Sequence, residues 1–464
     1  MRYLSTRGGD AGRSFSEALL AGLAPDGGLY LPQEWPRLSD ADWRALRGRR
    51  WEEVAVAVMA PFMGGFLEEA ELLALVEDAA ATFGHPAVTP LKQLDDNLWL
   101  LELFHGPTLA FKDVAMQILA RLMDEALQRL DARVTIIGAT SGDTGSAAIE
   151  AFRHSARADI FTLHPHQRVS EVQRRQMTTV DAPNVHNIAI EGDFDDCQAL
   201  VKAMFNDRPF RERMRLAGVN SINWGRILAQ VIYYATSALA LGAPDRSLAY
   251  VVPTGNFGDI FAGYVAQRMG LPIDRLVVAT NVNDILHRAL QQGEYRVAGA
   301  VTPTSSPSMD IQVSSNFERL LFDAVERDTA ALRAMMEQLA QSGGFALPEG
   351  ARAFIGQLFA SGRAGEDEVM AEIRRTFEET GEIVDPHTAV GLHVARQHLS
   401  AAHSVVSLAT AHPAKFPDAV EKACGQRPAL PAHLEDIMQA REHFDVLPAE
   451  LEAVEAFIAE RVGG

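Results

Sequence analysis

A glycine-rich turn in the middle of the chain has the composition of an anion-binding loop. Residues 252–259 read Val-Pro-Thr-Gly-Asn-Phe-Gly-Asp and join an apolar run to a segment with helical spacing. Glycine lets a backbone approach a ligand closely, and a helix start offers unpaired N–H groups with partial positive charge. These features suit a phosphate group. An ordinary strand-to-helix turn has the same composition, so the spacing of this phosphate loop, residues 254–259, leaves both interpretations open.

A second turn, the hydroxyl loop at residues 138–146, also separates a predicted strand from a predicted helix. It reads Gly-Ala-Thr-Ser-Gly-Asp-Thr-Gly-Ser. Amides and hydroxyls in such a loop can together bind a small carboxylate. The loop can instead cap the following helix, with Ser141 or Asp143 as the N-cap residue. Two such turns in one chain favour a ligand with two anionic ends.

Lys112 opens a predicted helix, directly after a glycine–proline turn and three apolar residues. A cation is unfavourable at a helix start. Apolar surroundings would lower the pKa of its amine and make it a usable nucleophile. An imine with an aldehyde cofactor requires such an amine. Most lysines are solvated surface groups, but the phosphate loop downstream strengthens the functional interpretation.

These three segments lie in a region of repeated strand, turn and helix patterns. Apolar runs predict strands at 97–104, 134–137, 248–252, 276–279 and 405–408. Helical spacing predicts a helix after each of the three chemical segments, at 112–130, at 144–154 and through residue 269. Such repeats indicate a mostly parallel sheet covered by helices, in which ligands bind at the carboxyl ends of the strands.

The chain divides into a small N-terminal unit and a large region behind it. Residues 1–85 contain two helical patterns before the chain-breaking Gly-His-Pro at 84–86. We therefore expect an N-terminal domain over 1–85 and a catalytic region of two α/β subdomains over 86–464. The more charged segment 301–381 is interpreted as helical and packed outside the α/β core, with a helical insertion around 325–380.

The composition argues against several classes of protein. Of 464 residues, 47% are hydrophobic and 22% charged, and the formal net charge is −19. This balance is typical of a globular protein of two or three domains, and the negative charge argues against a nucleic-acid partner. Cys197 and Cys424 alone build no disulfide framework or multi-cysteine metal site, which favours a reducing cytoplasm. No apolar run approaches the ~20 residues of a membrane span, and the first ten residues lack the blocks of a signal peptide.

The ordered set of motifs resembles the threonine synthase family, which belongs to the tryptophan-synthase-β-like enzymes that depend on pyridoxal 5'-phosphate (PLP). The matching segments are 3–7, 22–30, 105–113, 139–145, 220–224, 255–259, 314–319, 385–391 and 410–416. Each is modest evidence, but their order along nearly the whole chain is specific. The resemblance implies an α/β fold of type II, with mostly parallel sheets flanked by helices and a small N-terminal domain.

The resemblance also implies roles for individual residues. Lys112 would form the imine with PLP. Thr410 would hydrogen-bond the pyridine nitrogen, and Asn256 is also a candidate for the ring hydroxyl. A neutral hydroxyl at the ring nitrogen tempers the electron sink and favours elimination and replacement chemistry. The cofactor phosphate would lie on Gly255, Asn256, Phe257, Gly258 and Asp259.

By the same resemblance, the expected reaction converts O-phospho-L-homoserine and water to L-threonine and phosphate, the last step of threonine biosynthesis. The freed Lys112 would remove the α-proton. The γ-phosphate would then leave, and water would add at the β-carbon. The substrate carboxylate is expected at Thr140, Ser141, Gly142, Asp143 and Thr144. The candidates for the substrate phosphate, in order, are Lys415, Arg226, Ser315 and Asn316.

Several alternatives stay open at this point. Arg226 is equally typical of a salt-bridged surface group and Lys415 of a solvated loop lysine. A serine or threonine dehydratase would share Lys112 and the phosphate loop, and a non-catalytic relative would keep the fold as a binding protein. His387 is interpreted as a structural histidine. We expect no metal site, no membrane partner, and a monomer or homodimer in the cytoplasm.

Overall fold

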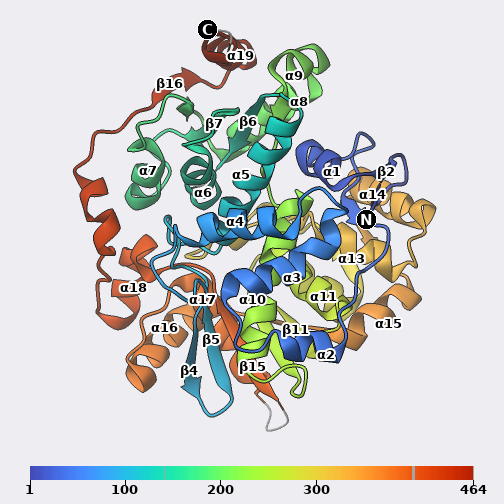
Figure 1. Ribbon diagram of the computed structural model, residues 1–464. Coiled ribbons are helices and arrows are strands. Elements are labelled where there is room, and N and C mark those ends of the chain that lie inside the picture. Colours follow the sequence, from blue (N-terminus) through green and yellow to red (C-terminus); the bar gives the residue numbers. More distant parts are fainter. Residues whose placement is uncertain (141, 400–402, 463–464) are drawn as a thin grey trace.

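Two large sheets lie at the centre of the computed structural model, which describes residues 1–140, 142–399 and 403–462 (Figure 1). In the described residues, the neighbouring strands of the larger sheet are parallel except for the antiparallel pair β4–β5. In spatial order its strands are β14 (Phe359–Arg363), β11 (Ile273–Thr280), β10 (Leu248–Pro253), β15 (Ser404–Ala409), β5 (Leu98–Glu102) and β4 (Leu91–Asp95). Parallel neighbours require crossover connections, and helices supply them.

The second sheet is parallel throughout its described strands. In spatial order they are β16 (Asp445–Pro448), β8 (Val185–Glu191), β7 (Ala158–Pro165), β6 (Val134–Ala139) and β9 (Leu216–Ala217). Its strands alternate in the chain with α6 (Asp143–Phe152), α7 (Glu171–Thr178), α8 (Phe194–Asn206) and α9 (Arg208–Met214). The C-terminal segment runs from α18 (Pro417–Cys424) beside the larger sheet to β16 and α19 (Leu451–Val462) at the smaller one (Figure 1).

Helices cover both faces of the larger sheet, so its central strands are apolar on both sides. Along β10, Leu248, Tyr250 and Val252 join one apolar cluster, whereas Ala249 and Val251 join another. This is the two-residue alternation of a strand buried on both faces. The helices are α10 (Trp224–Ala240) and α11 (Gly258–Arg268) on the first face, and α17 (Pro386–Gln397) with α16 (Glu366–Thr380) on the second.

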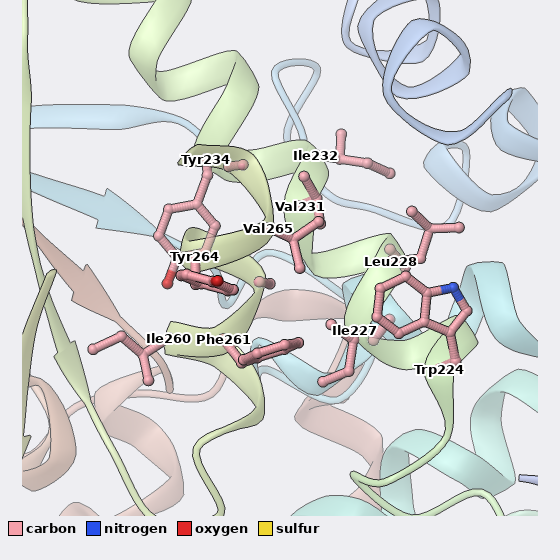
Figure 2. Close-up of a cluster of buried hydrophobic side chains, with 14 of the residues drawn as sticks. Trp224, Ile227, Leu228, Val231, Ile232, Tyr234, Ile260, Phe261, Tyr264 and Val265 are labelled. Atoms are coloured by element: carbon pink, nitrogen blue, oxygen red, sulfur yellow. The ribbon is translucent and has the colours of Figure 1, made fainter. Parts of the chain in front are cut away.

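The contact between α10 and α11 supports the phosphate loop through α11, the helix that begins in the loop. Ile227 and Val231 of α10 and Phe261 and Val265 of α11 are all buried, and the two helices lie side by side in the close-up (Figure 2). Their spacing of four residues places each pair on one helix face. Because α11 begins in the phosphate loop, this packing fixes the end of the helix at which the loop lies.

The N-terminal unit is tied to the rest of the molecule by buried polar contacts. The Tyr3 hydroxyl accepts from Trp224 Nε1 at 3.1 Å and donates to Phe62 O, within the unit, at 2.8 Å. Arg7 pairs with Glu318 at 2.9 Å. The elements of this unit are β1 (Tyr3–Ser5), β2 (Ala11–Arg13), α1 (Phe15–Ala21), β3 (Tyr30–Pro32), α2 (Asp40–Ala45), α3 (Trp51–Met63) and α4 (Glu69–Ala80).

The predicted strands and the helix that Lys112 opens are confirmed. The strands are β5, β6, β10, β11 and β15, and the helix is α5 (Lys112–Arg129). The apolar runs identified them because each strand is buried between helix layers.

The interpretation of segment 301–381 as helical is wrong at the short strand β13 (Gly344–Ala346) and at residues 359–363. Residues 359–363 form β14, which pairs in parallel with β11 from Phe359 opposite Leu276 to Arg363 opposite Thr280. The sequence Phe-Ala-Ser-Gly-Arg has one large apolar residue, so no apolar run revealed an edge strand. The rest of this part of the chain comprises α12 (Ile285–Gln292), β12 (Glu294–Arg296), α13 (Phe317–Ala324), α14 (Thr329–Ser342), β13 (Gly344–Ala346) and α15 (Glu349–Leu358).

Candidate active site

A cavity of about 2110 Å³ lies where the carboxyl ends of β6, β10 and β15 meet. Its lining includes Lys112, parts of the hydroxyl and phosphate loops, and Thr410 directly after β15. Strands β10 and β15 belong to the larger sheet and β6 to the smaller one, and ligands bind at the carboxyl ends of such parallel strands. Lys112, the two loops and Thr410, which lie up to about 300 residues apart in the chain, therefore meet in one place.

Lys112 is buried at the first position of α5, as its apolar neighbours predict. Its side chain donates from Nζ to Ser308 Oγ at 3.3 Å and to Asp143 Oδ2 at 3.4 Å. Burial lowers the pKa of the Lys112 amine from its usual range, although Asp143 opposes the shift. A lowered pKa increases the share of the free, nucleophilic amine, which imine formation requires.

The turn before α5 is fixed by its own hydrogen bonds. Asp113 accepts from the backbone N–H and the hydroxyl of Thr108, at 2.9 and 2.6 Å. Phe111 donates from its N–H to Thr410 O at 2.9 Å. These contacts join the start of α5 to the end of β15, so the backbones of Lys112 and Thr410 hold a fixed separation.

The phosphate loop combines glycine with an unusual backbone angle. Phe257 has φ of +64°, which is rare for a bulky residue, and its ring is buried against Phe317 and Phe359. A Cβ on Gly255 would lie 2.7 Å from Ser308 O. The loop thus occupies a strained shape held by packing, as ligand-binding segments often do. The first amides of α11, which follow at once, have no helical acceptors.

Two side chains support the phosphate loop from behind. Asn316 donates to Asn256 O from both its backbone N and its Nδ2, each at 3.0 Å, and Ser314 Oγ donates to Gly255 O at 2.7 Å. Asn316 is 0% exposed and is not part of the cavity lining. Its amide binds the loop, so the contact to a substrate phosphate that the sequence predicted has no geometric support here.

Asp259 turns its carboxyl toward the interior of the protein. Tyr233 and Tyr234 donate to its Oδ1 at 2.5 and 3.0 Å, and burial raises the pKa of Asp259 to about 7. A carboxylate repels a phosphate, so this residue can serve the predicted anion only through its backbone N–H.

Some polar groups of the hydroxyl loop hydrogen-bond to one another. Thr140 Oγ1 accepts from the backbone N–H groups of Gly142 and Gly145 at 3.0 and 2.9 Å. Thr140, Asp143 and Thr144 line the cavity, and Thr144 is half-buried. Ser141 lies outside the described residues.

Asp143 is the charge centre of the site. Lys415 Nζ lies 3.0 Å from its Oδ1 and Lys112 Nζ 3.4 Å from its Oδ2, while Gln173 and Ser308 donate to it at 2.9 and 3.0 Å. Burial alone would raise the pKa of Asp143, but the charges of Lys415 and Lys112 hold it well below its usual range. An ionised carboxylate with these partners holds the lysines in place and offers no direct attraction to a substrate carboxylate.

Lys415 is not a solvated loop lysine. It is 0% exposed and donates to Thr108 O at 2.7 Å and to Gln176 Oε1 at 2.9 Å, besides its pair with Asp143. These three acceptors match the three hydrogens of an ammonium group. Lys415 would therefore have to release one of them to bind a substrate phosphate.

Arg226 has the opposite character. It lines the cavity, is 3% exposed and donates from Nη1 to Val219 O at 3.1 Å. Its Nε has no hydrogen-bond partner among the described residues, and no carboxylate of that part of the chain pairs with it. Burial lowers the pKa of Arg226 to about 10. A buried guanidinium without a counter-ion is suited to an anionic ligand, and the interpretation as a salt-bridged surface group has no support.

The three remaining predicted residues, Ser315, Thr410 and His387, all line the cavity. Ser315 lines the cavity, and its hydroxyl lies 3.4 Å from Asn256 Oδ1. Thr410 also lines it and is 6% exposed. His387, interpreted as structural, is buried and bound on both ring nitrogens, by Asp385 at 2.7 Å and by the N–H of Ser308 at 3.2 Å.

Sequence reasoning missed Ser308, which contacts Lys112 and Asp143. It follows a run of serine, threonine and proline residues with no glycine motif and no helical or strand periodicity. Only the three-dimensional contacts reveal it. No cluster of three or more potential metal ligands occurs in the described residues, and no helix there combines the length and apolar character of a membrane crossing.

Fold and site together define an enzyme that depends on pyridoxal phosphate. A family model described as pyridoxal-phosphate dependent enzyme matches residues 83–365. On either side, models described as threonine synthase N terminus and threonine synthase, C-terminal match residues 2–80 and 388–458. The chain belongs to the threonine synthase family.

Individual relatives agree along the full length. The chain is 52% identical to threonine synthase of Pseudomonas aeruginosa over 99% of its own length and 98% of the relative. It is 57% identical to the PLP-bound threonine synthase structure from Brucella melitensis, with a TM-score of 0.98 and all of both chains covered. The yeast threonine synthase structure is 37% identical, with a TM-score of 0.94 over 100% of this chain and 99% of that one.

The residues of this chain fit the cofactor of that family. Lys112 supplies a buried amine of lowered pKa for an aldehyde. The phosphate loop supplies a helix start with free N–H groups. At Gly255, Ser308 O leaves no room for a Cβ, so the loop keeps its shape only with glycine there. Thr410 supplies a hydroxyl at the cavity wall.

Proposed function

We propose that the chain converts O-phospho-L-homoserine and water to L-threonine and phosphate, with Lys112 as its catalytic base. The single observation that carries the proposal is the buried amine of Lys112, which lies in the same cavity as the phosphate loop. PLP, when bound, supplies an electron sink for charge that develops on the substrate carbons. Family membership supports the choice of substrate, and a monomer or homodimer in the cytoplasm is part of the proposal.

The cofactor would be held at three points. The amides of residues 255–259 and the start of α11 bind its phosphate, Thr410 binds the ring nitrogen, and Asn256 reaches the ring hydroxyl. The left-handed Phe257 and the support from Asn316 keep these amides in place without help from the ligand. A preformed loop loses little entropy when it binds.

The two anionic ends of the substrate would meet different groups. The hydroxyl loop, Thr140–Thr144, binds the carboxylate through amides and the Thr144 hydroxyl, because the carboxylate of Asp143 is engaged with lysines. Arg226, with Ser315, binds the phosphate, since its buried guanidinium lacks a counter-ion among the described residues. With a net charge of −19, such local groups must attract an anionic substrate.

Lys112 Nζ would move the protons of the reaction. It takes the α-proton, because its lowered pKa increases the share of free amine that can accept one. The resulting ammonium is then stabilised by Asp143 while it donates a proton to another substrate carbon. Lys415 balances the charge of Asp143, so the carboxylate holds the amine without taking its proton permanently.

Product analysis tests the proposal. Incubation of the PLP-loaded enzyme with O-phosphohomoserine should release phosphate and threonine in equal amounts. Release of 2-oxobutyrate would favour the dehydratase, and no turnover would favour the binding protein. Lys112→Ala should reduce turnover by at least about 1,000-fold, because the anchor and the base disappear together; turnover that survives without added amine would contradict the assignment.

A further inference from the structure

We propose that Ser308 is a positioning residue for the reacting amine of Lys112, a role that rests on the proposed function and extends it. Ser308 lies in the 3-10 turn Pro307–Met309, far from Lys112 in the chain. Its hydroxyl accepts from Lys112 Nζ at 3.3 Å and donates to Asp143 Oδ2 at 3.0 Å. One hydroxyl thus connects the amine to the carboxylate that neutralises it.

The backbone of Ser308 is fixed on two sides. Its N–H donates to His387 Nε2 at 3.2 Å, and His387 Nδ1 binds Asp385 Oδ2 at 2.7 Å. Because Nε2 accepts, the ring proton lies on Nδ1 and faces Asp385. On the other side, Ser308 O lies 2.7 Å from the position that a Cβ on Gly255 would occupy. The hydroxyl therefore keeps a set position between the phosphate loop and His387.

This position solves a geometric problem of the reaction. The Lys112 amine sits at the end of a flexible four-carbon stem, and many rotamers would aim it away from the substrate. Once Nζ has taken a proton, one hydrogen can bond to Ser308 and a second to Asp143. The third is then left for transfer to the substrate. Ser308 itself is not an acid, because its own hydroxyl hydrogen is donated to Asp143.

The test compares PLP-loaded Ser308→Ala with the wild-type enzyme on O-phosphohomoserine. We expect kcat to fall by about tenfold or more and KM to change by less than about threefold, as for a group that acts on a proton-transfer step. The isotope effect on kcat with α-deuterated substrate should rise, because removal of the α-proton becomes slower. Ser308→Thr, which retains a hydroxyl, should recover most of the lost kcat.

Ser305→Ala is the matched control. Ser305 lies three residues earlier in the same segment, but its hydroxyl donates to Glu366 at 3.2 Å and it does not line the cavity. This variant should retain wild-type kcat and isotope effect.

The role of His387 is tested by a double-mutant cycle. If His387 acts through Ser308, adding His387→Ala to Ser308→Ala should lower kcat no further than the larger single change. Effects on kcat that multiply would show that His387 acts independently, which overturns this part of the proposal.

Three results would overturn the role of Ser308: kcat equal to that of Ser305→Ala, a loss confined to KM, or an unchanged isotope effect. Failure of the proposed function itself would look different, because the wild-type enzyme would then form no threonine.

Discussion

The phosphate loop and the hydroxyl loop have the same texture in the sequence but different physical roles. Both are glycine-rich turns that follow a parallel strand and begin a helix. The phosphate loop is supported from behind by Asn316 and Ser314, which leaves its amides to face a ligand. The hydroxyl loop binds its own amides with Thr140 and commits Asp143 to two lysines. One loop is therefore suited to hold the cofactor phosphate, and the other to organise charge around the reacting amine beside the proposed site of the substrate carboxylate.

Among changes to the two loops, the largest effect is expected from Asp143→Asn, which removes the charge centre of the hydroxyl loop. Lys112 and Lys415 would lose their shared counter-ion inside the protein. We expect the free energy of unfolding, measured in urea, to fall by about 3 kcal/mol. Turnover should fall by at least about 100-fold, because Lys112 loses the partner of its ammonium form.

Asp245→Asn is the control for that change. Asp245 also pairs with two cations, Arg44 at 2.6 Å and Arg47 at 2.7 Å, but its side chain is 49% exposed. Exposed pairs contribute less than about 1 kcal/mol. Equal losses of stability in the two variants would contradict the assignment of Asp143 as a buried charge centre.

A methyl group added to the phosphate loop should weaken the binding of the cofactor. In Gly255→Ala the new carbon would lie 2.7 Å from Ser308 O, a backbone atom that cannot rotate away. The loop must shift, and the dissociation constant of PLP, followed by absorbance during reconstitution, should rise by about tenfold or more. Gly350→Ala, where a Cβ meets nothing within 4 Å, should leave it unchanged.

A methyl group added to the hydroxyl loop should raise KM for the substrate. In Gly145→Ala the new carbon would meet Thr140 Cγ2 at 2.5 Å and Met177 Sδ at 2.8 Å, which are side-chain atoms able to adjust. We expect KM for O-phosphohomoserine to rise by about fivefold and the dissociation constant of PLP to stay near the wild-type value. If cofactor affinity fell as it does for Gly255→Ala, the two loops would not have separate roles.

The last effect is one on stability and concerns Asp259 at the end of the phosphate loop. Its pKa is about 7 in the folded protein, above the ordinary value of 3.8. Between these values the folded state holds a proton that the unfolded state has lost, so stability falls as the pH rises through this range. Asp259→Asn has no carboxyl to ionise, so it removes this loss of stability. In cofactor-free protein, its advantage over the wild type in free energy of unfolding should be about 2 kcal/mol larger at pH 8 than at pH 5. An advantage independent of pH would show that Asp259 ionises normally.

Much of the fold could be predicted from the sequence because buried elements carry apolar residues at strand or helix spacing. The apolar runs of β10 and β15 and the helical spacing of α5 each reflect a fully covered face. Strand β14 shows no such pattern, since an edge strand with glycine and serine carries little apolar surface. Ser308, likewise, is defined only by its contacts.

The site was predicted in outline, and the exceptions share one cause. Glycine turns and the lysine at a helix start indicated where the chemistry lies. The sequence could not indicate which polar groups are already engaged. Asn316 and Lys415 bind other parts of the protein, whereas Arg226 is left without a counter-ion in the described residues. Pairing of this kind depends on contacts between distant segments.

The most direct test of the central claim is to locate the lysine that carries the cofactor. Reduction of the PLP-loaded enzyme with borohydride should bleach its absorbance band and leave a pyridoxyl mass on the peptide that contains Lys112. Lys415 is an internal comparison, because it also contacts Asp143, at 3.0 Å, but has three acceptors already. A pyridoxyl adduct on Lys415, or the absence of one on Lys112, would contradict the account.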